Sequence, residues 1–296
     1  MTTPVLSSVP TPFAPFTLRL PEGQAVPLVC DSPHSGTFYP DDFRYALPFE
    51  QLRAGEDTDV HVLWESLPLV GATLLAAQFP RAYIDPNRDV EDIDPAMLDA
   101  PWPSPLNPSE KTRLGIGLIW RDAGADGRTP IYKRKLSVAE VLKRIARYHA
   151  PYQAAMREQI EAAHARFGAV WHLNLHSMPA NSYDGLQIRG EHPPLADFVL
   201  GDRDGTTAAP EFTAMVAEAL RKRGFSVAIN EPFKGVALIA RLGRPAERRH
   251  SLQVELHRGL YMNEQTRARS PDFPALQSAL AGVSAEIAAY VKDQVQ

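Results

Sequence analysis

The chain has 296 residues, of which 44% are hydrophobic and 22% charged, with a formal net charge of −4 and an isoelectric point of about 6.1. This length suits one large globular domain or two small ones, and without a basic stripe the sequence argues against nucleic acid as a partner. No run approaches the roughly 18 consecutive apolar residues of a membrane span, and the single cysteine, Cys30, excludes a cysteine-based zinc cluster and fits a cytoplasmic location.

The N-terminal segment differs from the rest of the chain. Residues 1–15 are rich in Thr, Ser and Pro and have neither a basic start nor a continuous apolar run, so they predict an irregular arm rather than a signal peptide. Residues 16–296 contain no repeat, linker or composition shift. We therefore expect a single catalytic α/β domain over 16–296.

Short apolar runs predict buried strands. In chain order these runs are residues 25–30, 72–77, 170–175, 226–229 and 251–256. Ser137 and Glu140 have the spacing of a capping box, which predicts a helix that begins there, runs to Phe167 and is kinked or divided at Pro151. Further helices are expected at residues 211–223, with Gly224 as the residue that ends the helix, and at 270–295.

Strands that alternate with helices predict an α/β fold with a mainly parallel sheet and helices on both faces. In such sheets ligand sites collect at the carboxyl ends of the strands. The polar residues that follow the predicted strands are therefore the first place to look for chemistry.

Two polar clusters follow the first predicted strand. His34 lies in a Ser-Pro-His-Ser-Gly turn that would present it to a metal, although a hydrogen-bonded loop histidine is the simpler interpretation when this turn is taken alone. Glu56, Asp57 and Asp59 follow, close to His61. These carboxylates suit a metal ion and equally suit the positive end of a helix dipole.

Two further clusters lie within predicted strands. His172, Asn174 and His176 alternate with apolar residues, so all three point to one face of a strand and need polar partners there. A metal-ligand role is favoured for His176 at the strand's end, whereas His172 lies deeper. Glu255 lies inside an apolar run, and a buried glutamate predicts either a general base or an internal salt bridge.

The segment RAYIDPNR at residues 81–88 carries two arginines seven positions apart. An arginine offers a planar fork that binds a carboxylate through two hydrogen bonds. Arg81 and Arg88, with Asn87 beside the second, therefore form a plausible clamp for a carboxylate and an oxyanion. Ordinary surface ion pairs are the alternative for each arginine taken singly.

Taken together, the motifs resemble a known family. PHSG, an ED/DTD segment, RxYIDxNR, LxLHSM and QVEL-R-LYM occur in the order and spacing of the N-formylglutamate amidohydrolases, over about residues 29–264. That family is similar to the zinc carboxypeptidases and aspartoacylases. The resemblance implies a single three-layer α/β/α domain around a mixed, mainly parallel sheet.

The resemblance also implies one zinc ion per chain, held by two histidines and a carboxylate. His34 matches the first ligand and His176 the last. Relatives place a glutamate three residues after the first histidine, where this chain has Thr37. We therefore assign the carboxylate to Asp57, with Glu56 and Asp59 as alternatives.

The remaining roles follow from the same resemblance. Arg81 would polarise the scissile carbonyl, Asn87 and Arg88 would hold a substrate carboxylate, and Glu255 would act as general base and acid. Arg189 is a candidate for a second substrate carboxylate on the strength of its position alone.

The expected reaction is hydrolysis of a small acidic N-acyl amino acid, N-formyl-L-glutamate, to formate and L-glutamate, with a place in amino-acid metabolism such as histidine degradation. One alternative is a deacylase of another N-acyl amino acid or a small carboxypeptidase-like metallopeptidase. A second alternative is a metal- or ligand-binding protein without catalysis. Cysteine-based hydrolysis through Cys30 is disfavoured, because an apolar setting raises the pKa of a thiol. The oligomeric state is left open.

Overall fold

A computed structural model describes residues 13–123 and 129–296 of the chain. Most of the expected irregular arm, residues 1–12, lies outside the described residues, and residues 13–15 form neither helix nor strand. By internal contacts the chain divides into two compact units, with residues 1–17, 36–56 and 77–155 in the first and residues 18–35, 57–76 and 156–296 in the second. The expectation of a single catalytic domain over 16–296 stays a prediction.

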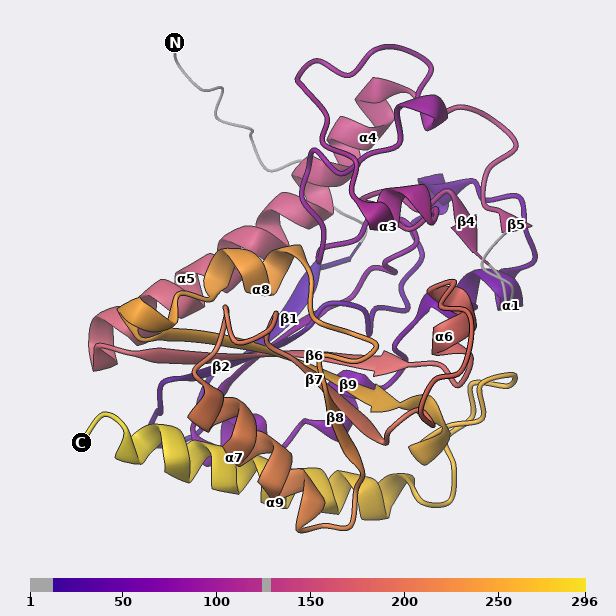
Figure 1. Ribbon diagram of the computed structural model, residues 1–296. Helices are drawn as coiled ribbons and strands as arrows, with labels where there is room; N and C mark the ends of the chain where they lie inside the picture. Colours follow the sequence, from indigo (N-terminus) through magenta and orange to yellow (C-terminus); the bar gives the residue numbers. More distant parts are fainter. Residues whose placement is uncertain (1–12, 124–128) are drawn as a thin grey trace. The chain divides into compact units, whose positions relative to one another are not determined.

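A seven-stranded sheet organises the second unit, and the ends of β1 and β3 belong to the first (Figure 1). Its order is β1-β3-β2-β6-β9-β7-β8, and the pairs β3–β2, β2–β6, β6–β9 and β7–β8 are parallel, whereas β7–β9 is antiparallel. The strands are β1 (Phe16–Arg19), β2 (Leu28–Ser32), β3 (Thr73–Ala77), β6 (Val170–Met178), β7 (Phe198–Gly201), β8 (Val227–Ile229) and β9 (Arg249–His257). The expected mixed, mainly parallel α/β fold is confirmed.

All five predicted strands are present within a few residues of their expected ends. The strands β1 and β7 were not predicted, nor was the two-stranded antiparallel pair β4 (Asp122–Ala123) and β5 (Thr129–Pro130). These four elements have two to four residues each, which gives a weak apolar signal, although the run at 226–229 does predict the three-residue strand β8.

Nine α-helices occur among the described residues. They are α1 (Phe49–Leu52), α2 (Val60–Leu63), α3 (Glu110–Arg113), α4 (Val138–Arg144), α5 (Ala150–Phe167), α6 (Ser182–Gly185), α7 (Pro210–Arg221), α8 (Ala237–Leu242) and α9 (Phe273–Asp293). Short 3₁₀ turns lie at Asp41–Phe43, Arg53–Gly55, Leu67–Val70, Pro95–Met97, Pro245–Glu247 and Arg258–Leu260. Within the described part of the chain, no helix is both long enough and apolar enough to cross a membrane.

The predicted long helix begins as expected and is divided as expected. The hydroxyl of Ser137 accepts a hydrogen bond from the N–H of Glu140 at 3.1 Å, which caps α4. Between α4 and α5 the chain widens into a π-helical turn, Ile145–His149. Pro151 explains this turn, because proline has no N–H to donate and its ring crowds the carbonyl four residues back.

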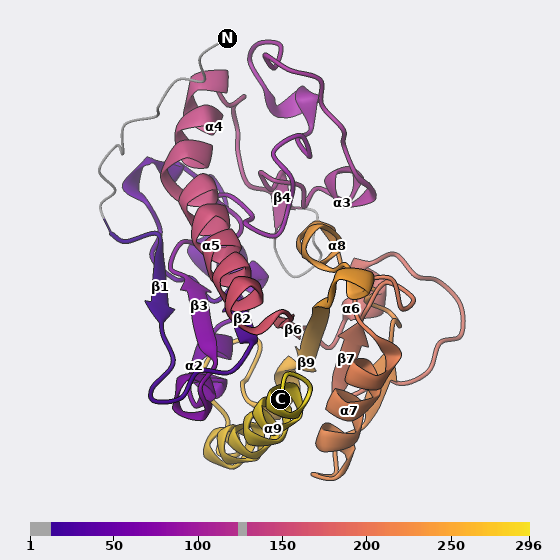
Figure 2. The ribbon, with the colours of Figure 1, turned by 90° about the vertical axis from the view of Figure 1, so that its left-hand side faces the viewer.

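The two faces of the sheet differ in character. Trp171, Leu173 and Leu175 of β6 point into an apolar core shared with α2, α7 and α9. Figures 1 and 2 show α7 and α9 side by side on this face, where the rings of Phe212 and Tyr290 lie 6.1 Å apart. His172, Asn174 and His176, which alternate with them, point to the opposite face. Figure 1 shows α8 on that side of the sheet. The apolar face therefore packs against the helices, and the opposite face carries the polar side chains singled out in the sequence.

Gly224 ends α7 in a left-handed conformation, with φ of +86°. Its N–H donates to the carbonyl of Arg221, and the N–H of Phe225 donates to that of Leu220, the paired bonds of a Schellman motif. A methyl group at Gly224 would meet no described atom within 4 Å, so the cost of substitution lies in the backbone alone.

We predict that Gly224→Ala lowers the free energy of unfolding by about 1–2 kcal/mol, because L-residues disfavour the left-handed region. The control is Gly185→Ala, which is equally uncrowded among the described atoms and lacks a positive φ. Urea unfolding measures both variants, and equal losses in the two would contradict this account of the α7 terminus.

Candidate metal centre

Two neighbouring strands end at the candidate site. His34 follows β2, and His176 lies near the end of β6, which pairs with β2 in parallel. Parallel neighbours bring their carboxyl ends to the same edge of a sheet, so the two rings meet although 142 positions separate them. Asp57 joins them from the turn before α2, and its N–H donates to the carbonyl of His34 at 3.0 Å.

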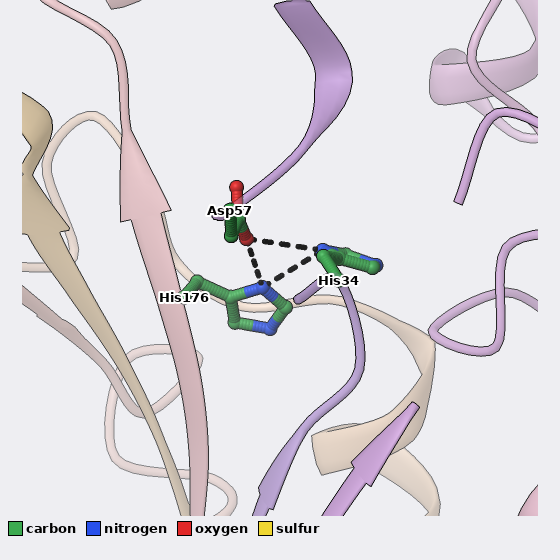
Figure 3. A group of neighbouring side chains, drawn as sticks. All are labelled: His34, Asp57 and His176. Atoms are coloured by element: carbon green, nitrogen blue, oxygen red, sulfur yellow. Dashed lines mark hydrogen bonds and ion pairs between the residues drawn. The ribbon is translucent and has the colours of Figure 1, made fainter. Parts of the chain in front are cut away.

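Three donor atoms converge at this point (Figure 3). The Nδ1 atoms of His34 and His176 lie 2.9 Å apart, and Oδ2 of Asp57 lies 3.3 Å from the first and 3.2 Å from the second. All three side chains are buried. The arrangement brings together the two histidines and the carboxylate that the sequence singled out.

The donor set fits a zinc ion. Zinc bonds to nitrogen and oxygen of about 2.0–2.1 Å in a tetrahedron place the ligand atoms about 3.3 Å apart. The two distances from the histidines to Oδ2 of Asp57 match that separation. The distance between the two Nδ1 atoms is somewhat shorter. Because lone pairs and a carboxylate repel at such distances, the group needs a proton or a cation among them, and two imidazoles with one carboxylate are a donor set that zinc accepts.

The charge of the site is balanced by a buried arginine. Burial opposes ionisation of Asp57, but the neighbouring imidazoles of His176 and His34, together with the charge of Arg258, hold the pKa of this carboxyl well below its usual range. Arg258 donates to Oδ1 of Asp57 at 3.0 Å and to the hydroxyl of Ser177 at 3.3 Å. Asp57 therefore presents one oxygen to the histidines and the other to Arg258.

The two alternative carboxylates are engaged elsewhere. Glu56 accepts hydrogen bonds from Tyr39 at 2.7 Å and from Arg53 at 3.0 Å. Asp59 forms a two-bond ion pair with Arg269, with distances of 2.7 and 3.0 Å. Asp57 is thus the carboxylate that the structure brings to His34 and His176.

Glu255 lies beside the candidate metal centre on the same face of the sheet. Its Cα is paired with that of His176 across the parallel strands β9 and β6, so the two side chains point the same way. Glu255 is buried, and Gln253 donates to its Oε1 at 3.0 Å. The position suits a carboxylate that exchanges protons with a group bound near His176.

In the first unit, Asp85 organises the segment predicted to bind substrate. Arg81 donates to Oδ2 of Asp85 at 3.0 and 3.2 Å and stacks over the ring of Trp120 at 4.8 Å. Oδ1 of Asp85 accepts from the N–H of Asn87 at 2.8 Å. Asn87 and Arg88 are both buried. This segment is a fixed turn built around one buried carboxylate.

Arg189 lies in an exposed loop that follows α6. Nothing in this placement assigns it a ligand, and its role in binding a second carboxylate stays a prediction.

Sequence reasoning missed three residues that the structure makes prominent. Arg258 follows β9 directly, Asp31 lies inside β2, and Asp85 lies between the two arginines of its segment. Each is a charged residue next to or within an apolar run. That signal was available, but the partners that give these residues a role are distant in the chain.

The fold is an α/β fold around a mainly parallel sheet. Two histidines and an aspartate gather at the carboxyl ends of adjacent strands and form a candidate metal centre of the kind that hydrolases use. The sequence profile of the N-formylglutamate amidohydrolases matches residues 26–262. The chain belongs to this family and is a hydrolase.

Individual relatives agree with this assignment. The chain is 30% identical to the N-formylglutamate deformylase of Pseudomonas aeruginosa over 248 residues, which cover 81% of this chain and 84% of that protein. It is 28% identical to the N-formylglutamate deformylase of Pseudomonas putida over 250 residues, covering 81% and 83%. The crystal structure of N-formylglutamate amidohydrolase from Ralstonia eutropha superposes with a TM-score of 0.92 at 61% identity, covering 96% of this chain and 100% of that one.

Cys30 is buried in β2, and burial together with the charge of Asp31 raises the pKa of its thiol well above the usual range. We predict that iodoacetamide leaves Cys30 of the native protein unmodified under conditions in which the urea-unfolded chain reacts fully, because only the exposed thiolate reacts. Mass spectrometry after timed quenching measures this. Rapid labelling of the native chain would show that the strand opens far more readily than its packing indicates.

Proposed function

We propose that this chain hydrolyses N-formyl-L-glutamate to formate and L-glutamate, using one zinc ion held by His34, Asp57 and His176. The convergence of these three buried donor atoms, in a chain of the N-formylglutamate amidohydrolase family, is the observation that carries the proposal. The names of the two Pseudomonas relatives support the choice of substrate. A bound divalent cation supplies two things to such chemistry, namely a lower pKa for water and stabilisation of negative charge on a carbonyl oxygen.

Glu255 carries the proton transfers. As the water oxygen forms its bond to the formyl carbon, Glu255 takes a proton from that water. When the C–N bond breaks, Glu255 returns this first proton to the departing nitrogen. The second water proton leaves the O–H of the newly formed formic acid and passes to the amine. The products are formate and the ammonium form of L-glutamate, so the carboxylate is regenerated in each cycle.

Four residues make the proposed substrate contacts. Arg81 stabilises the negative oxygen of the tetrahedral intermediate, an interaction that strengthens as charge develops there. Asn87 and Arg88 bind one substrate carboxylate, and Arg189 binds the other. The resemblance of residues 81–88 to a substrate-binding run supports the first three roles, and the rigid turn around Asp85 is the pre-organisation that such roles need.

A cytoplasmic location and a place in amino-acid or histidine breakdown complete the proposal. The single buried cysteine is consistent with a reducing compartment.

A formate-release assay paired with metal analysis tests the function. We expect N-formyl-L-glutamate to be turned over faster than N-acetyl- or peptidyl-glutamate, with one zinc ion per chain. We expect His176→Ala to lose both zinc and activity, because one of three ligands is gone, and His192→Ala, which alters an exposed histidine, to keep both. A preference for the acetyl or peptidyl substrate would favour the deacylase or peptidase alternative, and full activity of zinc-free His176→Ala would end the metal mechanism.

We predict that Glu255→Gln keeps zinc but lowers kcat by about 10²–10⁴-fold, the range expected for a general acid–base. Steady-state kinetics and metal content measure this, with Glu286→Gln, in a partly exposed ion pair of α9, as the control. A loss within about tenfold, or about 1.4 kcal/mol of barrier, would remove Glu255 from the proton-transfer role.

A further inference from the structure

A chain of buried polar side chains runs beneath His176 on the polar face of the sheet. His176 Nε2 lies 2.6 Å from Oδ1 of Asn174, and Nδ2 of Asn174 lies 2.7 Å from Oδ1 of Asp31. Asp31 is also 3.0 Å from Nε2 of His172, whose Nδ1 lies 2.7 Å from the hydroxyl of Ser251. All five side chains are buried.

The direction of these hydrogen bonds follows from the acceptor at one end. A carboxylate only accepts hydrogen bonds, so the Asn174 atom that faces Asp31 is the amide nitrogen. The amide oxygen must then face His176, and an amide oxygen also only accepts. The proton between Asn174 and His176 therefore belongs to Nε2 of His176.

This direction decides which nitrogen of His176 offers a lone pair. A neutral imidazole carries one N–H, and here that N–H is on Nε2. Nδ1 is left as the electron-pair donor, and Nδ1 is the atom that converges with His34 and Asp57. The ring is also held against rotation by the short bond to Asn174.

We propose that Asn174 and Asp31 are positioning residues, which fix the tautomer and orientation of His176 so that Nδ1 faces the site. The benefit of this orientation rests on the proposed function, because it presents Nδ1 to the proposed metal. The orientation itself follows from the contacts of Asp31, Asn174 and His176. Asp31 fixes the orientation of the Asn174 amide, and the amide oxygen in turn fixes His176. The negative charge of Asp31 thus orients His176 through Asn174 rather than by direct contact.

The tautomer can be measured without any substitution and without metal. In the metal-free protein, ¹⁵N-edited NMR of the neutral imidazole reports which ring nitrogen carries the proton. We expect the proton of His176 on Nε2. A neutral ring protonated on Nδ1 overturns the proposal.

A substitution tests the consequence for metal binding. Asn174→Leu keeps a similar volume but removes the acceptor, and we expect zinc affinity, measured by competition with a chromophoric chelator, to fall about 10–100-fold. The matched control is Ser251→Ala, which removes an equally buried hydroxyl from the far end of the same chain. That variant should keep zinc affinity within about threefold, because it does not contact Asn174 or His176.

The outcomes separate the two proposals. Urea unfolding of the metal-free variants measures their stability. If Asn174→Leu loses stability but keeps its zinc affinity, Asn174 has a merely structural role and the positioning proposal is overturned. Equal losses of zinc affinity in Asn174→Leu and Ser251→Ala overturn it as well. If the unaltered protein binds no zinc, the proposed function fails, while the tautomer of His176 still decides the positioning role.

Discussion

Three electron-pair donors held within about 3 Å of one another are an arrangement that a protein interior does not tolerate without a shared proton or a cation. His34, Asp57 and His176 are held in this way, with the closest pair at 2.9 Å. The surroundings of the site supply what this arrangement needs. Arg258 balances the outer oxygen of Asp57, and Asn174 directs the outer nitrogen of His176.

The strand β6 shows how one segment serves both folding and chemistry. Its apolar side chains pack against α7 and α9, and this face supplies the hydrophobic stabilisation. His172, Asn174 and His176 point to the other face, and each has a hydrogen-bond partner on β9, β2 or β6 itself. Because successive side chains of a strand point to opposite faces, the polar residues lie on one face and the core residues on the other. The polar network therefore does not interrupt the apolar core.

Much of this could be predicted from the chain, and the reasons for the rest are physical. Apolar runs of four or six residues predict β2, β3, β6, β8 and β9, whereas the four-residue strands β1 and β7 were not recognised. The departure at Thr37 implies a carboxylate from elsewhere in the chain, with Asp57 chosen over Glu56 and Asp59, and the structure brings Asp57 to the histidines. Arg258 and Asp31 could not be assigned roles, because their partners Asp57 and Asn174 are supplied by tertiary structure rather than by neighbours in the chain.

The long separation of His34 and His176 has a consequence for assembly. No helix, hairpin or other local fragment contains both rings, and they meet only once β2 and β6 have paired across 142 positions. Contacts this distant in sequence carry a large loop-closure entropy and form slowly. A cation that requires both rings recognises the finished sheet far better than the unfolded chain, so its binding energy adds to the stability of the native state by mass action.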